Sequence, residues 1–180
     1  MRTKFAAALA ALLLVAATAA AQDAGQGKVS MNDFAGTWVL DASKSQLGMG
    51  GPGGGQGQGP VEETMTVARA GDKITVERKI KGQQGERTVN DVITADGKEG
   101  DFTAQMRGNE IKGKRTAKWS ADGSTLEVSD KANVETQNGP MTFETSSKWT
   151  LSDGGKTLTI EQTRTTPRGP QTSKRVYAKK

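Results

Sequence analysis

Three arginines lie at alternating positions in segments that otherwise have the pattern of β-strands. Residues two apart share one face of a strand. Arg78 thus shares a face with Val76 and Ile80, Arg115 with Gly113 and Ala117, and Arg164 with Leu158 and Ile160. A charged side chain on a buried face is costly unless it finds a partner. Each arginine therefore either reaches solvent near a strand end, as long side chains do easily, or lines a cavity. In a cavity the planar guanidinium group could donate two parallel hydrogen bonds to a carboxylate or a phosphate.

Other chemistry is restricted by composition, because the chain has no histidine and no cysteine. Ser-His and Cys-His nucleophile systems are excluded, as are most zinc, copper and haem sites. We find no Asp-x-Asp-x-Asp-Gly calcium loop, and we expect no metal and no cofactor. Acid–base catalysis would need carboxylates, Lys or Tyr, and no spacing pairs the carboxylates Glu62, Glu63, Asp101, Glu110 and Glu144. We therefore expect a protein that is not an enzyme.

The elements that must position these residues are strands. Runs rich in Thr, Val and Ile alternate with short turns such as Asp122-Gly123 and Asp153-Gly154, which are favoured in hairpins. A weak repeat, Trp…Asp-Gly, begins at Trp119 and again at Trp149. Strands are expected over 34–40, 61–69, 73–80, 86–94, 111–119, 125–134, 141–151, 157–165 and 172–178, with a weaker one near 101–106. Closure removes exposed edges, so the sequence predicts an all-β fold, a single antiparallel up-and-down β-barrel of about 8–10 strands.

The ends and one internal segment differ from this pattern. Residues 1–21 combine a basic head, an apolar run and a small-residue site at Ala19-Ala20-Ala21, which predicts a signal peptide cleaved after Ala21. We expect a periplasmic or secreted protein with no transmembrane segment after cleavage. Residues 22–33 are expected to form a disordered lead-in to the barrel over 34–180. Residues 48–60 are rich in glycine and lack the Gly-Lys-Ser/Thr ending of a phosphate loop, so we expect a flexible loop.

Basic residues exceed acidic ones only slightly and are spread along the chain. Proteins that bind nucleic acids more often cluster their lysines and arginines on one face. The sequence therefore predicts no nucleic-acid partner. It leaves the oligomeric state open.

Both ends of the expected barrel resemble the calycin superfamily of lipocalins and intracellular fatty-acid-binding proteins. The first strand reads FAGTWVL over residues 34–40, similar to the Gly-x-Trp strand that opens those barrels. The resemblance implies that Trp38 closes one end, whereas on its own it would be read as a core aromatic. The last strand contains Arg175-Val176-Tyr177, similar to the Arg-x-Tyr by which fatty-acid-binding proteins hold a ligand carboxylate. In lipocalins an arginine of the last strand packs over the opening tryptophan instead.

The chain also resembles small exported bacterial lipocalin-like proteins. Two functions follow from this reading. The first is a non-catalytic barrel that holds a small hydrophobic or amphiphilic anion in its lumen, since the mouths of β-barrels are common ligand sites. The ligand contacts would be Arg175, Tyr177, Arg78, Arg115, Arg164, Trp119, Trp149 and Phe143. The alternative is a cell-envelope interaction or structural protein, in which side chains fill the barrel and the outer face binds a partner.

Overall fold

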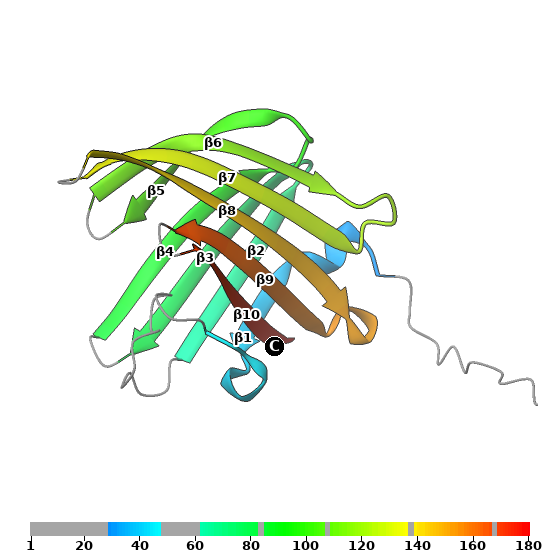
Figure 1. Cartoon of the computed structure of the whole chain (residues 1–180). Helices are drawn as coiled ribbons and strands as arrows, with labels where there is room; N and C mark the ends of the chain where they lie inside the picture. The colour runs from blue at the N-terminus through cyan, green and yellow to red at the C-terminus, as the bar shows by residue number, and fades with distance from the viewer. Residues whose placement is uncertain (1–28, 48–61, 83–84, 107–108, 137–138, 167–168) are drawn as a thin grey trace, which may run out of the picture.

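The chain forms a meander of ten antiparallel strands in the computed structural model (Figure 1). The structure describes residues 29–47, 62–82, 85–106, 109–136, 139–166 and 169–180. The strands are β1 (Gly36–Leu40), β2 (Glu62–Ala70), β3 (Lys73–Gly82), β4 (Gly85–Thr94), β5 (Glu99–Met106), β6 (Asn109–Trp119), β7 (Thr125–Thr136), β8 (Gly139–Ser152), β9 (Thr157–Thr166) and β10 (Gly169–Lys179). Short 3-10 helices are η1 (Met31–Phe34), η2 (Ala42–Lys44) and η3 (Asp153–Gly155). The all-β prediction is confirmed, including the weaker strand near 101–106.

The strands follow one another around a nearly closed barrel. Their order is β4-β3-β2-β1-β10-β9-β8-β7-β6-β5, so consecutive strands pair except β4 with β5. Strand β1 pairs with β10, with Trp38 opposite Lys179. This order leaves β4 and β5 as the two edges of the sheet. In the described part of the chain, no helix is long and apolar enough to cross a membrane.

Apolar side chains fill the barrel near the end where β1 begins, which we call the closed end. Trp38 is fully buried there and its indole N–H donates to the Phe34 carbonyl at 2.9 Å. The Lys179 ammonium lies 5.0 Å from the centre of the Trp38 ring. Thus Lys179, and not Arg175, packs over the opening tryptophan. Arg175 lies farther from the closed end on β10. The core comprises Phe34, Trp38, Met65, Val67, Ile74, Val76, Ile93, Ala95, Ala117, Leu126, Val128, Trp149, Leu151, Leu158, Ile160 and Tyr177.

Residues 29–33 are folded, which corrects the prediction of a disordered lead-in for that part of 22–33. Asp33 accepts hydrogen bonds from the backbone N–H and the hydroxyl of Ser30, at 2.7 and 2.9 Å. These bonds lower the pKa of Asp33 and cap η1, while Phe34 anchors the helix in the core. Residues 1–21, 22–28 and the glycine-rich segment 48–60 lie outside the described residues.

We call the opposite end of the barrel, where β3 ends and β4 begins, the open end. Val89 lies directly opposite Arg78 in the β3–β4 register, and Arg78 lies opposite the buried Met65, so Val89 faces inward. Even so, Val89 is 42 % exposed. Because β4 is an edge of the sheet, this exposure shows that part of the inner surface beside the β4–β5 seam is in contact with solvent.

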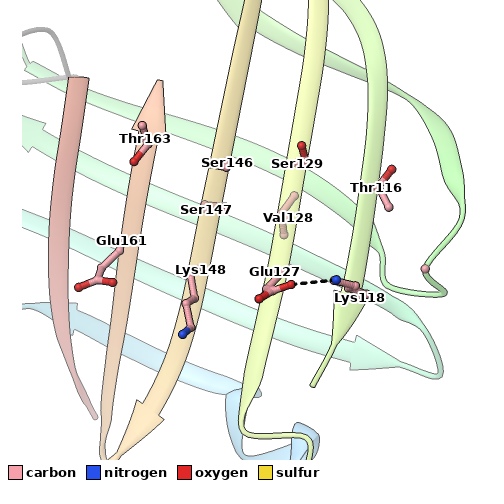
Figure 2. Close-up of a pocket in the computed structure, with 11 residues that line it drawn as sticks. Thr116, Lys118, Glu127, Val128, Ser129, Ser146, Ser147, Lys148, Glu161 and Thr163 are labelled. Atoms are coloured by element: carbon pink, nitrogen blue, oxygen red, sulfur yellow. Dashed lines mark ion pairs between the residues drawn. The ribbon is translucent and has the colours of Figure 1, made fainter. Parts of the chain in front are cut away.

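The outer face of β6–β9 is polar and carries a groove of about 680 Å³ (Figure 2). Hydroxyl groups form one row across the strands, since Thr116 pairs with Ser129, Ser129 with Ser146 and Ser146 with Thr163. A row of alternating charges lies beside it, comprising Lys118, Glu127, Lys148 and Glu161. Lys118 and Glu127 form an ion pair at 3.2 Å. This groove lies outside the barrel.

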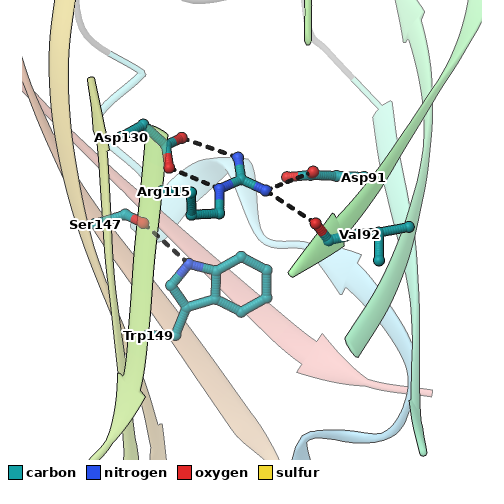
Figure 3. Close-up of polar contacts among 6 residues, drawn as sticks. All are labelled: Asp91, Val92, Arg115, Asp130, Ser147 and Trp149. Carbon is teal, nitrogen blue, oxygen red and sulfur yellow. Dashed lines mark hydrogen bonds and ion pairs between the residues drawn. The ribbon is translucent and has the colours of Figure 1, made fainter. Parts of the chain in front are cut away.

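Arg115 bridges the seam between β4 and β5. From β6 it donates to Asp91 at 2.7 Å and to the Val92 carbonyl at 3.2 Å, both on β4. It also donates twice to Asp130 on β7, at 2.6 and 2.9 Å (Figure 3). Its guanidinium lies 4.6 Å from the centre of the Phe102 ring on β5. Side chains, rather than a backbone ladder, therefore hold this seam together.

The charge of Arg115 is secured by these partners. Burial alone would lower the pKa of Arg115, but the hydrogen bonds that it donates to Asp130 and Asp91 outweigh this effect and raise that pKa above its ordinary value. The structure thus gives Arg115 a role that neither sequence alternative included. Arg115 does not reach solvent at a strand end, and its hydrogen bonds go to the protein's own carboxylates rather than leaving it free for a ligand.

We predict that Arg115→Met destabilises the barrel and loosens its seam. Two carboxylates lose their cation. We expect the free energy of unfolding to fall by about 2–4 kcal/mol, because both carboxylates are only partly buried. Amide hydrogen exchange should rise in β4 and β5 more than in β8 and β9. Lys114→Met is the matched control, since Lys114 precedes Arg115 and pairs with Asp101 at the surface. Equal losses in both variants would contradict the role of Arg115.

Candidate functional site

Four polar residues form a buried cluster inside the barrel, between the apolar core and the open end. Glu63 lies on β2, Arg78 on β3, and Arg175 and Tyr177 on β10. Glu63 shares its face of β2 with the buried Met65 and therefore points inward. Glu63 and Arg175 are each 5 % exposed and Tyr177 is fully buried. The alternation of the strands thus brings charged groups into the interior, where they need partners.

The Glu63 carboxylate is the centre of this cluster. The Tyr177 hydroxyl donates to one of its oxygens at 2.7 Å. The Nε atom of Arg78 lies 4.0 Å from the same oxygen, and the Nε atom of Arg175 lies 3.9 Å from the other. One carboxylate thus stands between two guanidinium groups, at distances that are too long for hydrogen bonds.

This arrangement leaves positive charge and hydrogen-bonding capacity unused. Arg78, Arg175 and Glu63 together carry a net charge of about +1, because arginine stays protonated in proteins. The Nε–H of Arg175 is buried and has no hydrogen-bond partner in the described part of the chain. Most buried polar groups in proteins are paired with protein or ordered water. The cluster is therefore suited to accept the oxygen of an anion.

Tyr177 stays a hydrogen-bond donor in this setting. Burial raises the pKa of the Tyr177 phenol well above its ordinary value; the charge of Arg78 acts against this shift, and Glu63 adds to it. A deprotonated phenol would face the Glu63 carboxylate and lose its hydrogen bond to that group. The phenol therefore orients Glu63 over a wide range of pH.

The structure brings some of the predicted site residues together and separates others. Arg78 lies with its guanidinium 5.9 Å from the centre of the Trp149 ring, which adds Trp149 to the wall of the cluster. Trp149 donates to the Ser147 hydroxyl at 3.3 Å (Figure 3). Arg175, Tyr177, Arg78 and Trp149 thus lie together in the candidate site. Arg115 belongs to the seam instead.

Phe143 and Arg164 are half-buried and lie nearer the open end. Arg164 lies opposite Thr145, whereas Arg175 lies opposite Ile160, four residues away from Arg164 on β9. Four residues of a strand span about 13 Å. Arg164 is therefore apart from the cluster, on the wall that a long ligand would meet.

Trp119 lies at the closed end rather than at the cluster. Its ring packs edge-on against Phe34 at 4.9 Å, and the Arg69 guanidinium lies 5.8 Å from its centre. Phe34 reaches this place because η1 crosses the closed end. The prediction of Trp119 as a ligand contact did not take η1 into account, because the sequence analysis treated that segment as disordered.

Sequence analysis missed the role of Glu63, which it considered only as a carboxylate for catalysis. Its position was informative, because Glu63 alternates with Met65 and Val67 on β2. A carboxylate on an apolar face indicates a buried partner. Among the described residues, no three carboxylates gather in a way that could hold a metal ion.

Known proteins share this architecture but not its sequence. No family model matches the chain, and no curated protein does. Zebrafish ileal bile acid-binding protein, solved in complex with cholic acid, superposes with a TM-score of 0.52 at 16 % identity, covering 82 % of this chain and 99 % of that chain. The chain has a calycin-like fold. The resemblance of its first and last strands to calycins is thus confirmed at the level of the fold.

The raised pKa of Tyr177 can be measured directly, because the chain contains one tyrosine. Phenolate absorbance during an alkaline titration should show a midpoint above the ordinary value of about 10. Because the pKa of Tyr177 is higher in the folded state than in the unfolded state, the contribution of Tyr177 to stability is fully present below about pH 10. This contribution is lost as the pH rises through the folded-state pKa. Tyr177→Phe should lack that loss. A midpoint of about 10 in the folded protein would contradict the buried Tyr177–Glu63 contact.

Proposed function

We propose that this protein is an exported, non-catalytic binding protein that holds a small amphiphilic anion in its barrel. The anionic group would lie at Arg175 and Arg78. The apolar part would lie along Trp149 and Phe143 toward the open end. Export is proposed from the signal-peptide pattern of residues 1–21, as a periplasmic or secreted location.

The observation that carries this proposal is the buried Nε–H of Arg175, which makes no hydrogen bond within the described part of the chain. Its side chain is buried beside a single shared carboxylate, and its Nε–H lacks a hydrogen-bond partner among the described residues. A ligand carboxylate could supply two acceptor oxygens to such a group. The exposed inner surface at Val89 supports the proposal, because it offers a path from solvent into the barrel.

The test compares a charged and an uncharged ligand of equal chain length. Titration calorimetry with dodecanoate and dodecanol should show dodecanoate binding weakened about ten- to hundredfold by Arg175→Met, the range expected for a lost hydrogen bond to a charged group. Dodecanol binding should change little. Arg69→Met is the matched control, because Arg69 also packs over a tryptophan, but at the closed end. Equal weakening of both ligands would contradict an anion site at Arg175.

The outer groove of β6–β9 favours a second candidate function, the binding of an envelope component on the outer face (Figure 2). Its rows of hydroxyl and charged groups would suit a polar surface rather than an apolar ligand. This function would leave both dodecyl ligands unbound. Substitutions in the groove, such as Lys148→Met, would then change the interaction, while Arg175→Met would not.

A further inference from the structure

Glu63 occupies the position from which an anion would contact both arginines of the cluster. Its carboxylate oxygens lie 4.0 Å from Arg78 and 3.9 Å from Arg175. Tyr177 holds this carboxylate in place through the 2.7 Å hydrogen bond. The protein therefore carries its own counter-ion inside the candidate binding site.

We propose that Glu63 sets the charge selectivity of the lumen and restricts it to ligands with a single negative charge. This inference rests on the proposed function of the cluster. Arg78 and Arg175 bring two positive charges, and Glu63 cancels one of them. One ligand charge makes the buried cluster neutral, whereas a second would be buried without a cation, which is costly.

The geometry allows Glu63 and a ligand to share the arginines. Neither guanidinium is within hydrogen-bonding distance of Glu63, so their N–H groups stay available to an incoming oxygen. Arg78 is 27 % exposed, and it is thus the arginine that an entering anion meets first. Arg175 and Glu63 are more deeply buried, and charges in the interior are screened less than charges at the surface.

Three ligands with one chain length separate charge from apolar contact. Dodecyl phosphate carries nearly two negative charges at about pH 8, because the second pKa of a phosphate monoester is about 6. Methyl dodecyl phosphate carries one charge and dodecanol none. Wild-type protein should bind the methyl ester at least about tenfold more tightly than dodecyl phosphate or dodecanol. A tenfold ratio of affinities corresponds to roughly one buried charge left without its interaction.

Glu63→Gln should move this preference toward the dianion. The amide keeps an acceptor for Tyr177 but removes the negative charge, so the ratio of dodecyl phosphate to methyl ester affinity should rise at least about tenfold. Glu62→Gln is the matched control, since Glu62 is the preceding residue and pairs with Lys81 at the surface. It should leave the ratio unchanged.

The outcomes are distinguishable. Binding of none of the three ligands by the wild type would overturn the proposed function itself. Binding with the same charge preference in Glu63→Gln and Glu62→Gln would overturn the role of Glu63 alone. If Glu63→Gln fails to fold, Arg78→Met provides the second test, because it makes the cluster neutral and should shift preference from the methyl ester to dodecanol about tenfold. An unchanged preference there would also overturn the inference.

Discussion

Closure of the seam between β4 and β5 is the constraint on which the interior depends. Consecutive strands pair with each other, except β4 with β5, and β1 pairs with β10, so β4 and β5 are the edges of the sheet. The Arg115 guanidinium on β6 spans this interruption with hydrogen bonds to Asp91 and the Val92 carbonyl on β4. Two further bonds to Asp130 on the neighbouring strand β7 hold it in place. Closure also brings β3 toward β8, where Arg78 lies over Trp149. The contact between Arg78 and Trp149 therefore depends on the curvature that closes the barrel.

The arginines on the inner face differ in how fully the protein satisfies them. Arg115 has two carboxylates and a carbonyl, which account for its charge and hold the seam together. Arg78 and Arg175 share one carboxylate, Glu63, at distances beyond hydrogen bonding. The excess of positive charge is therefore local to one cluster. That difference separates a structural arginine from the arginines proposed to bind an anion.

Local patterns predicted the strands well, because alternation and turn residues act over a few neighbouring positions. Every expected strand is present, and the inward face of β3 was correctly identified from Ile74, Val76 and Ile80. Partners across the barrel were not predictable in this way. Asp91 meets Arg115 only because the barrel closes between β4 and β5, and Glu63 meets Arg175 only because β1 joins β2 to β10. Asp130, in contrast, lies directly opposite Arg115 in the β6–β7 hairpin. Likewise η1 is a single short turn, whose fold depends on a cap and on Phe34 packing.

The central claim is that a small anion occupies the barrel, and native mass spectrometry tests it most directly. The protein should be purified gently from the cells that produce it, so that a bound molecule is retained. The account predicts a stoichiometric additional mass that organic solvent releases, that carries one ionisable acidic group, and that Arg175→Met largely loses. A bare protein mass that fatty acids and bile acids leave unchanged would contradict the account.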